Sequence, residues 1–243
     1  SFSMPIEELI NTYLPQFSGI LQNYWGRNTI HLHSEYLGAG VLLLAVAGLG
    51  ARGDDARRRL FWFWTGALVV SLLWAVFGYS LVFGEGTPWL GGFGNAMLAN
   101  LADLRAGTTL PETTFALFQM TFAIITPALV IGAFVERVRF GWVVAFSTLW
   151  TILVYLPVAR WIWGGGWLAT DVGTLDFAGG IVVHTTAGVA ALIVAKLLGP
   201  RRGFSKTLLA PHSPALTMVG AGLLWVGWFG FNGGSALAAN DDA

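Results

Sequence analysis

A series of long apolar runs, separated by polar and charged segments, constrains this chain more than any other feature of its sequence. A helix needs roughly 20 apolar residues to cross the hydrocarbon core of a bilayer. In lipid every backbone N–H and C=O must find a partner within the protein, and a helix supplies all of them itself. The sequence therefore predicts an all-α fold, a polytopic membrane helix bundle of about six transmembrane helices. The predicted spans are 36–51, which is short, and 60–83, 115–135, 141–162, 177–198 and 215–239.

Composition indicates the same class. Of the 243 residues, 55% are hydrophobic and 11% are charged, against about 25% charged in an ordinary soluble domain. The 13 basic and 13 acidic side chains cancel, and without a basic face nucleic acid is not expected as a partner. The sequence contains no cysteine, which excludes disulfides and thiol catalysis. We expect an integral membrane protein without a cofactor.

The chain divides into two regions. Residues 1–35 mix aromatic and polar side chains, as is typical of an extramembrane or interfacial segment, and show no pattern of a cleavable signal peptide. His31, His33 and Glu35 are of the types that bind zinc. Histidines two residues apart share a face only on a strand, so a plain interfacial turn is the other interpretation, and we predict no metal site. Residues 36–243 form the transmembrane region, which we expect to be truncated at its C-terminus.

Loop charges predict the orientation of the bundle. Positive side chains concentrate in the cytoplasmic loops of membrane proteins. If six spans alternate, one side carries ten basic residues and the other carries three. We therefore expect the N-terminus to lie outside a bacterial plasma membrane. The ten are Arg52, Arg57, Arg58, Arg59, Arg137, Arg139, Lys196, Arg201, Arg202 and Lys206, and the three are Arg27, Arg105 and Arg160.

One ionisable side chain, His184, lies inside the predicted fifth span. Ionisable residues in membrane helices are costly and usually serve a function. Gly180, His184, Gly188 and Ala191 recur at helical spacing, which places the histidine on a stripe of small residues that would allow close helix packing. His184 should therefore face protein or a cavity, where it either serves a function or only bonds a neighbouring helix.

Aromatic side chains recur at helical spacing on two other spans. Phe118 and Phe122 lie one turn apart on the third span, where Pro127 lacks the N–H for its helical bond and should kink the helix. Phe231 and Ser235 lie one turn apart on the sixth span. Ordinary packing would also explain this spacing, so the pattern alone assigns no function.

Longer blocks of sequence are more specific. In order along the chain they are GYSLVFGEG, FQMTFAIITPALVIGAFVERVRF, WGGGWLAT, DFAGGIVVH and LLWVGWFGFNGGSA. These blocks resemble the ammonium transporter family, the Amt, Mep and Rh proteins. The resemblance covers residues from about 72 to 240, whereas residues 1–70 resemble the family poorly. It implies that the chain corresponds to the first inverted repeat and the next helix of an eleven-helix ammonium channel. Channels of this family form homotrimers.

The resemblance also implies roles for individual residues. Phe118, Trp163 and Ser235 would form an outer recruitment site, where a small cation over aromatic rings gains up to about 2 kcal/mol and a hydroxyl oxygen accepts one of its N–H bonds. Phe122 and Phe231 would form the pore gate just below this site.

Three polar residues complete the implied site. Gln119 would lie near the vestibule. His184 would line the pore as the first of two histidines, the second belonging to a later helix; a neutral imidazole can bond ammonia or pass a proton. Asp176 would cap the fifth helix, because the free N–H groups and the dipole at a helix N-terminus stabilise a carboxylate. Direct ligation of the cation is the alternative for Asp176.

The predicted function is therefore transmembrane transport of ammonium or ammonia, in which the cation is recruited, loses a proton near the gate and crosses as ammonia. The alternative is a membrane module that senses ammonium or assists assembly without transport, or an inert fragment. An enzyme is not expected, because no Ser-His-Asp arrangement or paired carboxylates occur at suitable spacing and WGGGW lacks the Lys-Ser/Thr of a phosphate loop.

Overall fold

The computed structural model describes residues 65–134, 137–201, 203–204, 206 and 213–237. Over these residues the chain is helical, and its only paired extended residues form two isolated bridges, Gly86 with Gly91 and Leu104 with Pro111. The all-α helix bundle is confirmed. The predicted segment 1–35 and the predicted first span lie outside the described residues.

Five helical runs are long and apolar enough to cross a membrane, and each corresponds to one of the predicted spans. Thr65 is where the described residues begin, so the start of the first run is not compared. The other boundaries differ by a few residues at most ends; Glu112, for example, continues its helix beyond the apolar part. The run that begins at Phe140 differs most, since helical residues reappear after Trp163. The five runs are Thr65–Phe83, Glu112–Ile131, Phe140–Thr170, Gly180–Leu198 and Pro214–Gly234.

Three of the runs contain a π-helical turn, a conformation that is rare and occurs mostly at functional sites. The second described run, α5 (Glu112–Ile131), contains none and continues as one helix through Pro127. The sixth predicted span is the unbroken helix α10 (Pro214–Gly234). The other elements are η1 (Trp74–Gly78), α4 (Tyr79–Phe83), η2 (Ala96–Leu98), α6 (Phe140–Trp150), η3 (Thr151–Tyr155), α7 (Leu156–Ile162), α8 (Trp167–Thr170), η4 (Gly180–Thr185) and α9 (Thr186–Leu198).

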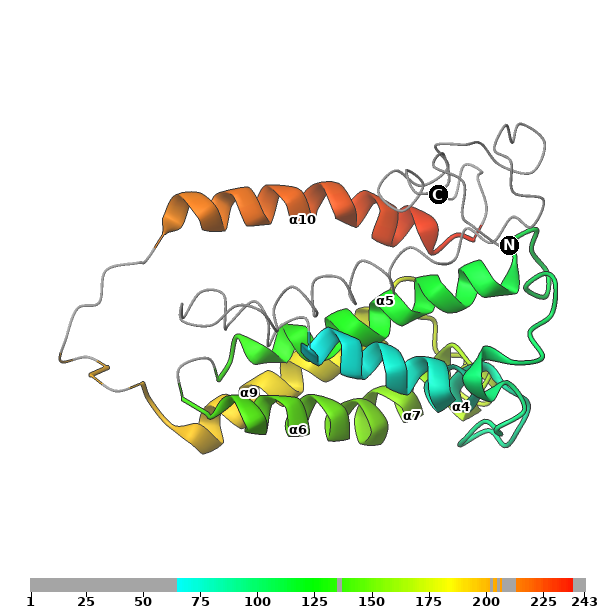
Figure 1. Ribbon diagram of the computed structural model, residues 1–243, viewed down its shortest axis with the longest axis horizontal. Coiled ribbons are helices and arrows are strands. Elements are labelled where there is room, and N and C mark those ends of the chain that lie inside the picture. The colour runs from blue at the N-terminus through cyan, green and yellow to red at the C-terminus, as the bar shows by residue number, and fades with distance from the viewer. Residues whose placement is uncertain (1–64, 135–136, 202, 205, 207–212, 238–243) are drawn as a thin grey trace, which may run out of the picture.

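Helix α5 is the central element of the bundle. It packs against α9 and α6 and against all three π turns, and Figure 1 shows it between α10 and the helix that ends in α4. Large aromatic side chains fill the space around it: Trp74, Tyr79, Phe122 and Tyr155 are each at most 1% exposed. The Trp74 indole N–H donates to the carbonyl oxygen of Ala116 at 3.0 Å, which fixes the first described span against α5.

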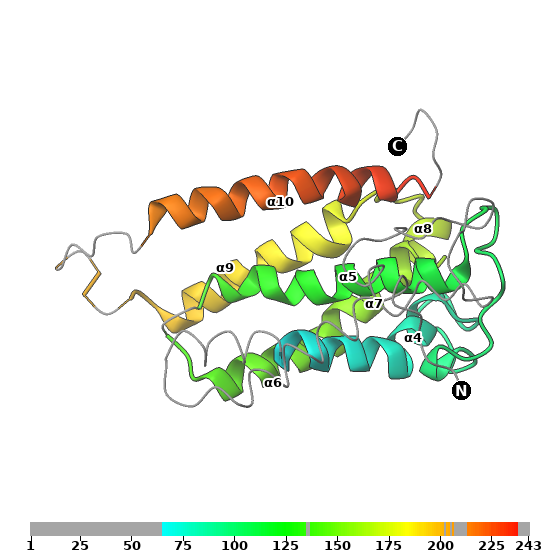
Figure 2. The same cartoon turned by 45° about the horizontal axis from the view of Figure 1, so that its top comes forward.

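Helix α10 lies at the edge of the bundle in both views (Figures 1 and 2). None of its spanning window is buried, and Phe231 is its one described residue that packs against the main core. Exposed apolar side chains such as Trp225 and Phe229 carry little cost in lipid, whose tails are as apolar as they are.

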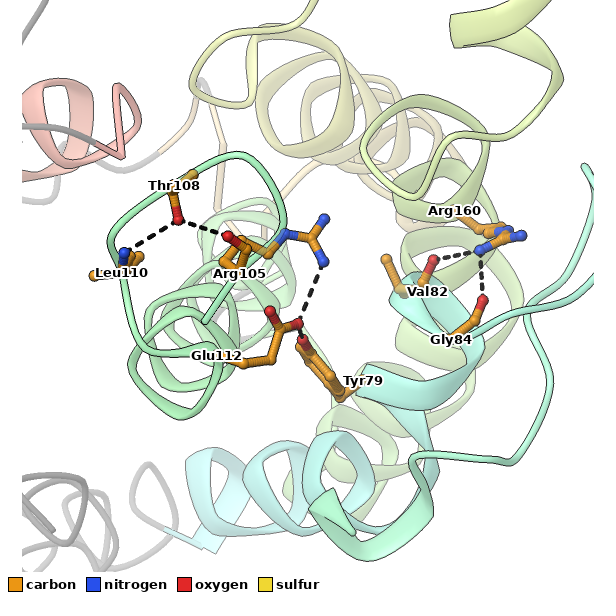
Figure 3. Close-up of polar contacts among 8 residues, drawn as sticks. All are labelled: Tyr79, Val82, Gly84, Arg105, Thr108, Leu110, Glu112 and Arg160. Carbon is orange, nitrogen blue, oxygen red and sulfur yellow. Dashed lines mark hydrogen bonds and ion pairs between the residues drawn. The ribbon is translucent and has the colours of Figure 1, made fainter. Parts of the chain in front are cut away.

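Arg160 fixes the loop that follows α4. Its guanidinium donates to the carbonyl oxygens of Val82 at 3.0 Å, Gly84 at 2.9 Å and Thr87 at 2.9 and 3.2 Å, and Figure 3 shows the first two of these bonds. Carbonyls at a helix C-terminus lack partners within the helix, and the dipole there favours a cation. Arg160, only 6% exposed, therefore holds this loop against α7.

A cavity lined by aromatic side chains at one end of the bundle

Side chains from three separate helices meet around one cavity of about 160 Å³. Phe118 comes from α5, Trp163 from the end of α7 and Ser235 from the C-cap of α10. Gln119 and Phe122 lie in the same wall. The structure thus brings together five of the eight residues that the sequence singled out. The remaining lining residues are Phe83, Arg105, Phe115, Phe177 and Leu237.

Phe122 in the cavity wall packs against Phe231, which is not itself a lining residue. The ring centroids of Phe122 and Phe231 lie 4.4 Å apart with their planes tilted by 43°. Phe122 is 1% exposed, and the rings of Phe118 and Trp163 meet it nearly edge-on, at 4.9 and 5.3 Å. Such edge-to-face contacts hold ring orientations and add about 1 kcal/mol each, so Phe122 has little freedom to move.

The cavity offers an oxygen acceptor as well as ring faces. The Gln119 side-chain oxygen is buried and has no hydrogen-bond partner among the described residues. The Ser235 hydroxyl donates to the Phe231 carbonyl at 2.9 Å, which leaves its oxygen lone pairs available. A buried acceptor without a partner is costly. The Ser235 oxygen suits a solute that carries N–H or O–H donors, whereas the Gln119 oxygen, although it belongs to a lining residue, is itself covered by protein atoms.

The glycines after Trp163 bring its loop into contact with the loop after α4. A Cβ on Gly164 would overlap the Val82 carbonyl oxygen, and one on Gly166 would lie 2.5 Å from the Pro88 oxygen, so neither position accepts a side chain. Trp163 is also held from the other side, because its indole N–H donates to the Asp176 backbone oxygen at 2.8 Å. Both contacts fix the ring at the cavity wall.

Asp176 caps the fifth helical run. Its Oδ1 accepts the N–H groups of Gly179 and Gly180 at 2.6 and 2.8 Å, and its Oδ2 accepts those of Ile181 and Val182, both at 2.8 Å. The carboxylate is therefore engaged by all four N–H groups that a helix N-terminus leaves without partners. It is not among the residues that line the cavity.

His184 lies in the π turn η4 and is not among the residues that line the cavity. Its ring centroid is 6.3 Å from that of Phe231 and 5.4 Å from that of Trp228. Nδ1 lies 2.9 Å from the Gly179 carbonyl oxygen. Because a carbonyl only accepts, Nδ1 carries the hydrogen, and Nε2 of the neutral ring is left as an acceptor. Phe231 therefore neighbours both Phe122 of the cavity wall and the ring of His184.

The stripe of small residues faces a different direction from the one expected. Gly180, His184 and Gly188 are exposed, whereas α9 packs on α5 through the adjacent face, which contains Ala187 (2% exposed). His184 is thus exposed on the side away from α5 and lies beside the rings of Trp228 and Phe231 of α10, so its facing protein or a cavity stays a prediction. The π turn accounts for part of this difference, because its wider winding shifts the residues after Gly180 off the 3.6-residue spacing.

Sequence reasoning missed half of the cavity wall. Phe83 and Phe115 flank the guanidinium of Arg105, which belongs to the connection between the first two described spans. No periodicity marks a residue in such a connection. Arg105 and Glu112 form an ion pair. They are seven residues apart with Pro111 between them, and this spacing does not predict such a pair. His31, His33 and Glu35 lie outside the described residues.

Five apolar runs around a small cavity with aromatic walls define a polytopic helical membrane protein with a site at one end of its bundle. The chain belongs to the Ammonium Transporter Family, whose model matches residues 46–243. It is accordingly an integral membrane protein. The match starts at residue 46, so the family resemblance begins earlier than the motifs indicate, which place its start near residue 72.

Individual relatives agree with this assignment. Ammonium transporter 1 of Dictyostelium discoideum is 48% identical over 185 residues, which are 74% of this chain and 40% of that protein. The crystal structure of Mep2 from Candida albicans has a TM-score of 0.64 at 34% identity, covering 85% of this chain and 48% of that one. A structure titled Sensor Amt Protein has a TM-score of 0.67 at 28% identity, covering 87% and 55%. The chain spans about half the length of the proteins it matches.

Proposed function

We propose that the protein conducts ammonium or ammonia across a membrane, and that the cavity is its cation recruitment site. One observation carries the proposal: aromatic side chains and the Ser235 hydroxyl line a cavity next to the stacked pair Phe122 and Phe231, and His184 lies beside Phe231. Ammonium carries four N–H donors and a charge that aromatic faces attract. Membership of the Ammonium Transporter Family supports the same substrate.

Three residues recruit the cation in this proposal. Trp163 and Phe118 present ring faces, and Ser235 accepts an N–H bond through its hydroxyl oxygen. Gln119 lies beside them in the cavity wall, although its side-chain oxygen is covered by protein atoms. The hydroxyl oxygen replaces water that the ion leaves behind, which limits the cost of removing a charge from solvent.

The ion then meets Phe122 and Phe231, the proposed gate. A full charge between two phenylalanine rings would have no hydrogen-bond partner, whereas neutral ammonia is far cheaper to place there. Loss of a proton before the gate therefore favours passage. His184 lines the pore beyond Phe231 and offers Nε2 as an acceptor for ammonia or for a returning proton. Asp176 serves this path indirectly, by capping the turn that carries the histidine.

The cavity faces outward in this proposal, in a bacterial plasma membrane with the N-terminus outside. That side carries three basic residues, among them Arg105 and Arg160, against ten on the other. The positive-inside rule then favours the opposite end as cytoplasmic. Assembly as a homotrimer belongs to the same proposal and rests on family membership.

Uptake of radiolabelled methylammonium by cells expressing the protein tests this function. Trp163→Leu and His184→Asp should each abolish uptake, because one loses a ring face and the other places a charge beyond the gate. Trp161→Leu is the matched control: it also lies near the end of α7, but its ring contacts Trp89 and Trp167 rather than the cavity. Absence of uptake by the unmodified protein would refute the proposal.

Ammonium sensing is the second candidate function. The neighbour titled Sensor Amt Protein favours it, since its fold matches this chain as well as the Mep2 structure does. Calorimetry on the detergent-purified protein, combined with flux into liposomes, separates the two functions. Ammonium binding without flux would support a sensor, and binding with flux would support a transporter. Neither binding nor flux would indicate an inert fragment.

A further inference from the structure

A charged side chain, Arg105, lies in the wall of the cavity beside the aromatic side chains and pairs with Glu112, which is outside the wall. The guanidinium carbon of Arg105 is 4.3 Å from the ring centroid of Phe115 and 5.1 Å from that of Phe83. Its Nη1 is 3.3 Å from Oε1 of Glu112. Of the ten lining residues within the described part of the chain, Arg105 is the one with a charged side chain. The electrostatic potential of the cavity therefore depends strongly on this group and on its partner.

The fold holds both partners in place. The Arg105 N–H donates to the Leu110 carbonyl at 2.8 Å, and the Thr108 hydroxyl donates to the Arg105 carbonyl at 3.0 Å while it accepts the Leu110 N–H (Figure 3). Glu112 opens α5, where the dipole favours a carboxylate, and the Tyr79 hydroxyl donates to the same Oε1. Ordering the loop around Arg105 and the side chain of Glu112 costs conformational entropy. A pair held by this many hydrogen bonds differs from an ion pair between two freely moving surface side chains.

The position of Arg105 opposes the entry of a second cation. Its guanidinium already covers faces of Phe83 and Phe115, so these rings are unavailable, whereas no described basic side chain covers Phe118, Phe122 or Trp163. Its positive charge also repels a cation in the cavity, and Glu112 offsets this repulsion. With side-chain exposures of 25% for Arg105 and 9% for Glu112, the pair is screened less than one in open solvent.

We propose that the Arg105–Glu112 pair sets the cation affinity of the cavity, and that Arg105 is a specificity-determining residue of the recruitment site. The inference rests on the proposed function, because it assigns a regulator of affinity to the same site. Arg105 lowers the affinity for monovalent cations and directs them to Phe118 and Trp163. Glu112 limits this effect by neutralising most of the guanidinium charge.

Methylammonium uptake by Arg105→Gln, Glu112→Gln and the double variant tests the proposal. The first leaves a carboxylate uncompensated and should lower KM roughly fivefold, and the second leaves a guanidinium uncompensated and should raise KM by a similar factor, as Coulomb's law gives at intermediate dielectric constant. The double variant should return KM to near the unmodified value. The maximal rate should stay unchanged in all three, and the KM shifts should shrink at high salt.

Arg105→Lys is the matched control, because it keeps the charge and loses the planar fork. Its KM should stay within twofold of the unmodified value, and a fivefold fall like that of Arg105→Gln would overturn the charge argument. Unchanged KM in both glutamine variants would also overturn the proposal, as would a rise in both without recovery in the double variant. If Glu112→Gln does not fold, the contrast between the two Arg105 variants decides alone. No uptake by the unmodified protein would refute the proposed function and this inference together.

Discussion

Replacing Asp176 with asparagine tests whether this carboxylate supports the helix or binds the cation. Each of its oxygens accepts two backbone N–H groups at 2.6 to 2.8 Å. An asparagine retains one oxygen, and its NH₂ group, in either orientation of the amide, faces two N–H donors that it cannot satisfy. Hydrogen bonds to a charged group contribute roughly 1.5–3 kcal/mol each. With relaxation of the turn, we expect Asp176→Asn to lower the free energy of unfolding by about 3 kcal/mol.

Thermal unfolding of the detergent-purified protein, followed by tryptophan fluorescence, measures this loss. In a chain of this size 1 kcal/mol corresponds to roughly 2–4 °C, so Tm should fall by roughly 6–12 °C. Asp171→Asn is the control, because Asp171 is exposed and its side chain bonds the neighbouring Thr170 hydroxyl. Substitutions of that kind change stability by about 0.5 kcal/mol or less, so Tm should move by about 2 °C at most.

The result that refutes this reasoning is specific. If Asp176→Asn unfolded at the temperature of the unmodified protein but transported nothing, the carboxylate would have to act on the cation, as in the ligation alternative. If it lost both stability and transport, and transport recovered at a lower temperature where the helix is folded, the capping role would account for both effects.

Two further predictions follow from the loops and the gate. Gly164→Ala should reduce the yield of folded protein far more than Gly165→Ala, because the methyl group at position 164 would overlap the Val82 oxygen. The space around Gly165 is open, and only its φ of +71° opposes alanine, at about 1 kcal/mol. Fluorescence-detected size exclusion compares the two yields, and equal yields would contradict the contact between Gly164 and Val82. Phe231→Ala should increase proton leak into liposomes carrying a pH-sensitive dye, because it removes the ring that neighbours both Phe122 and His184. Phe229→Ala is its control, since Phe229 is 70% exposed and its ring contacts Trp225, and equal leak in both variants would argue against a gate.

Periodicity and apolar length were enough to predict the helices of the described region, because the bilayer leaves a long apolar run no other secondary structure. They also placed Phe118, Phe122, Phe231 and Ser235 on faces that meet. Periodicity was not enough to predict the site. Trp163 follows the end of α7, and the glycines after it contact residues about eighty positions earlier in the chain. A contact of that kind leaves no local pattern, and only the resemblance to a family indicated it.

The face of His184 shows why helical spacing failed at one point. Spacing assumes 3.6 residues per turn, but the run from Gly180 begins with a π turn, in which the His184 N–H bonds the carbonyl of Gly179 five residues earlier. The wider turn moves His184 away from the face that packs on α5 and toward Phe231 and Trp228 of α10. The four N–H bonds to Asp176 hold the start of this turn. The carboxylate therefore determines where the histidine points, although it does not line the cavity, and this is why its loss should impair both stability and the path beyond the gate.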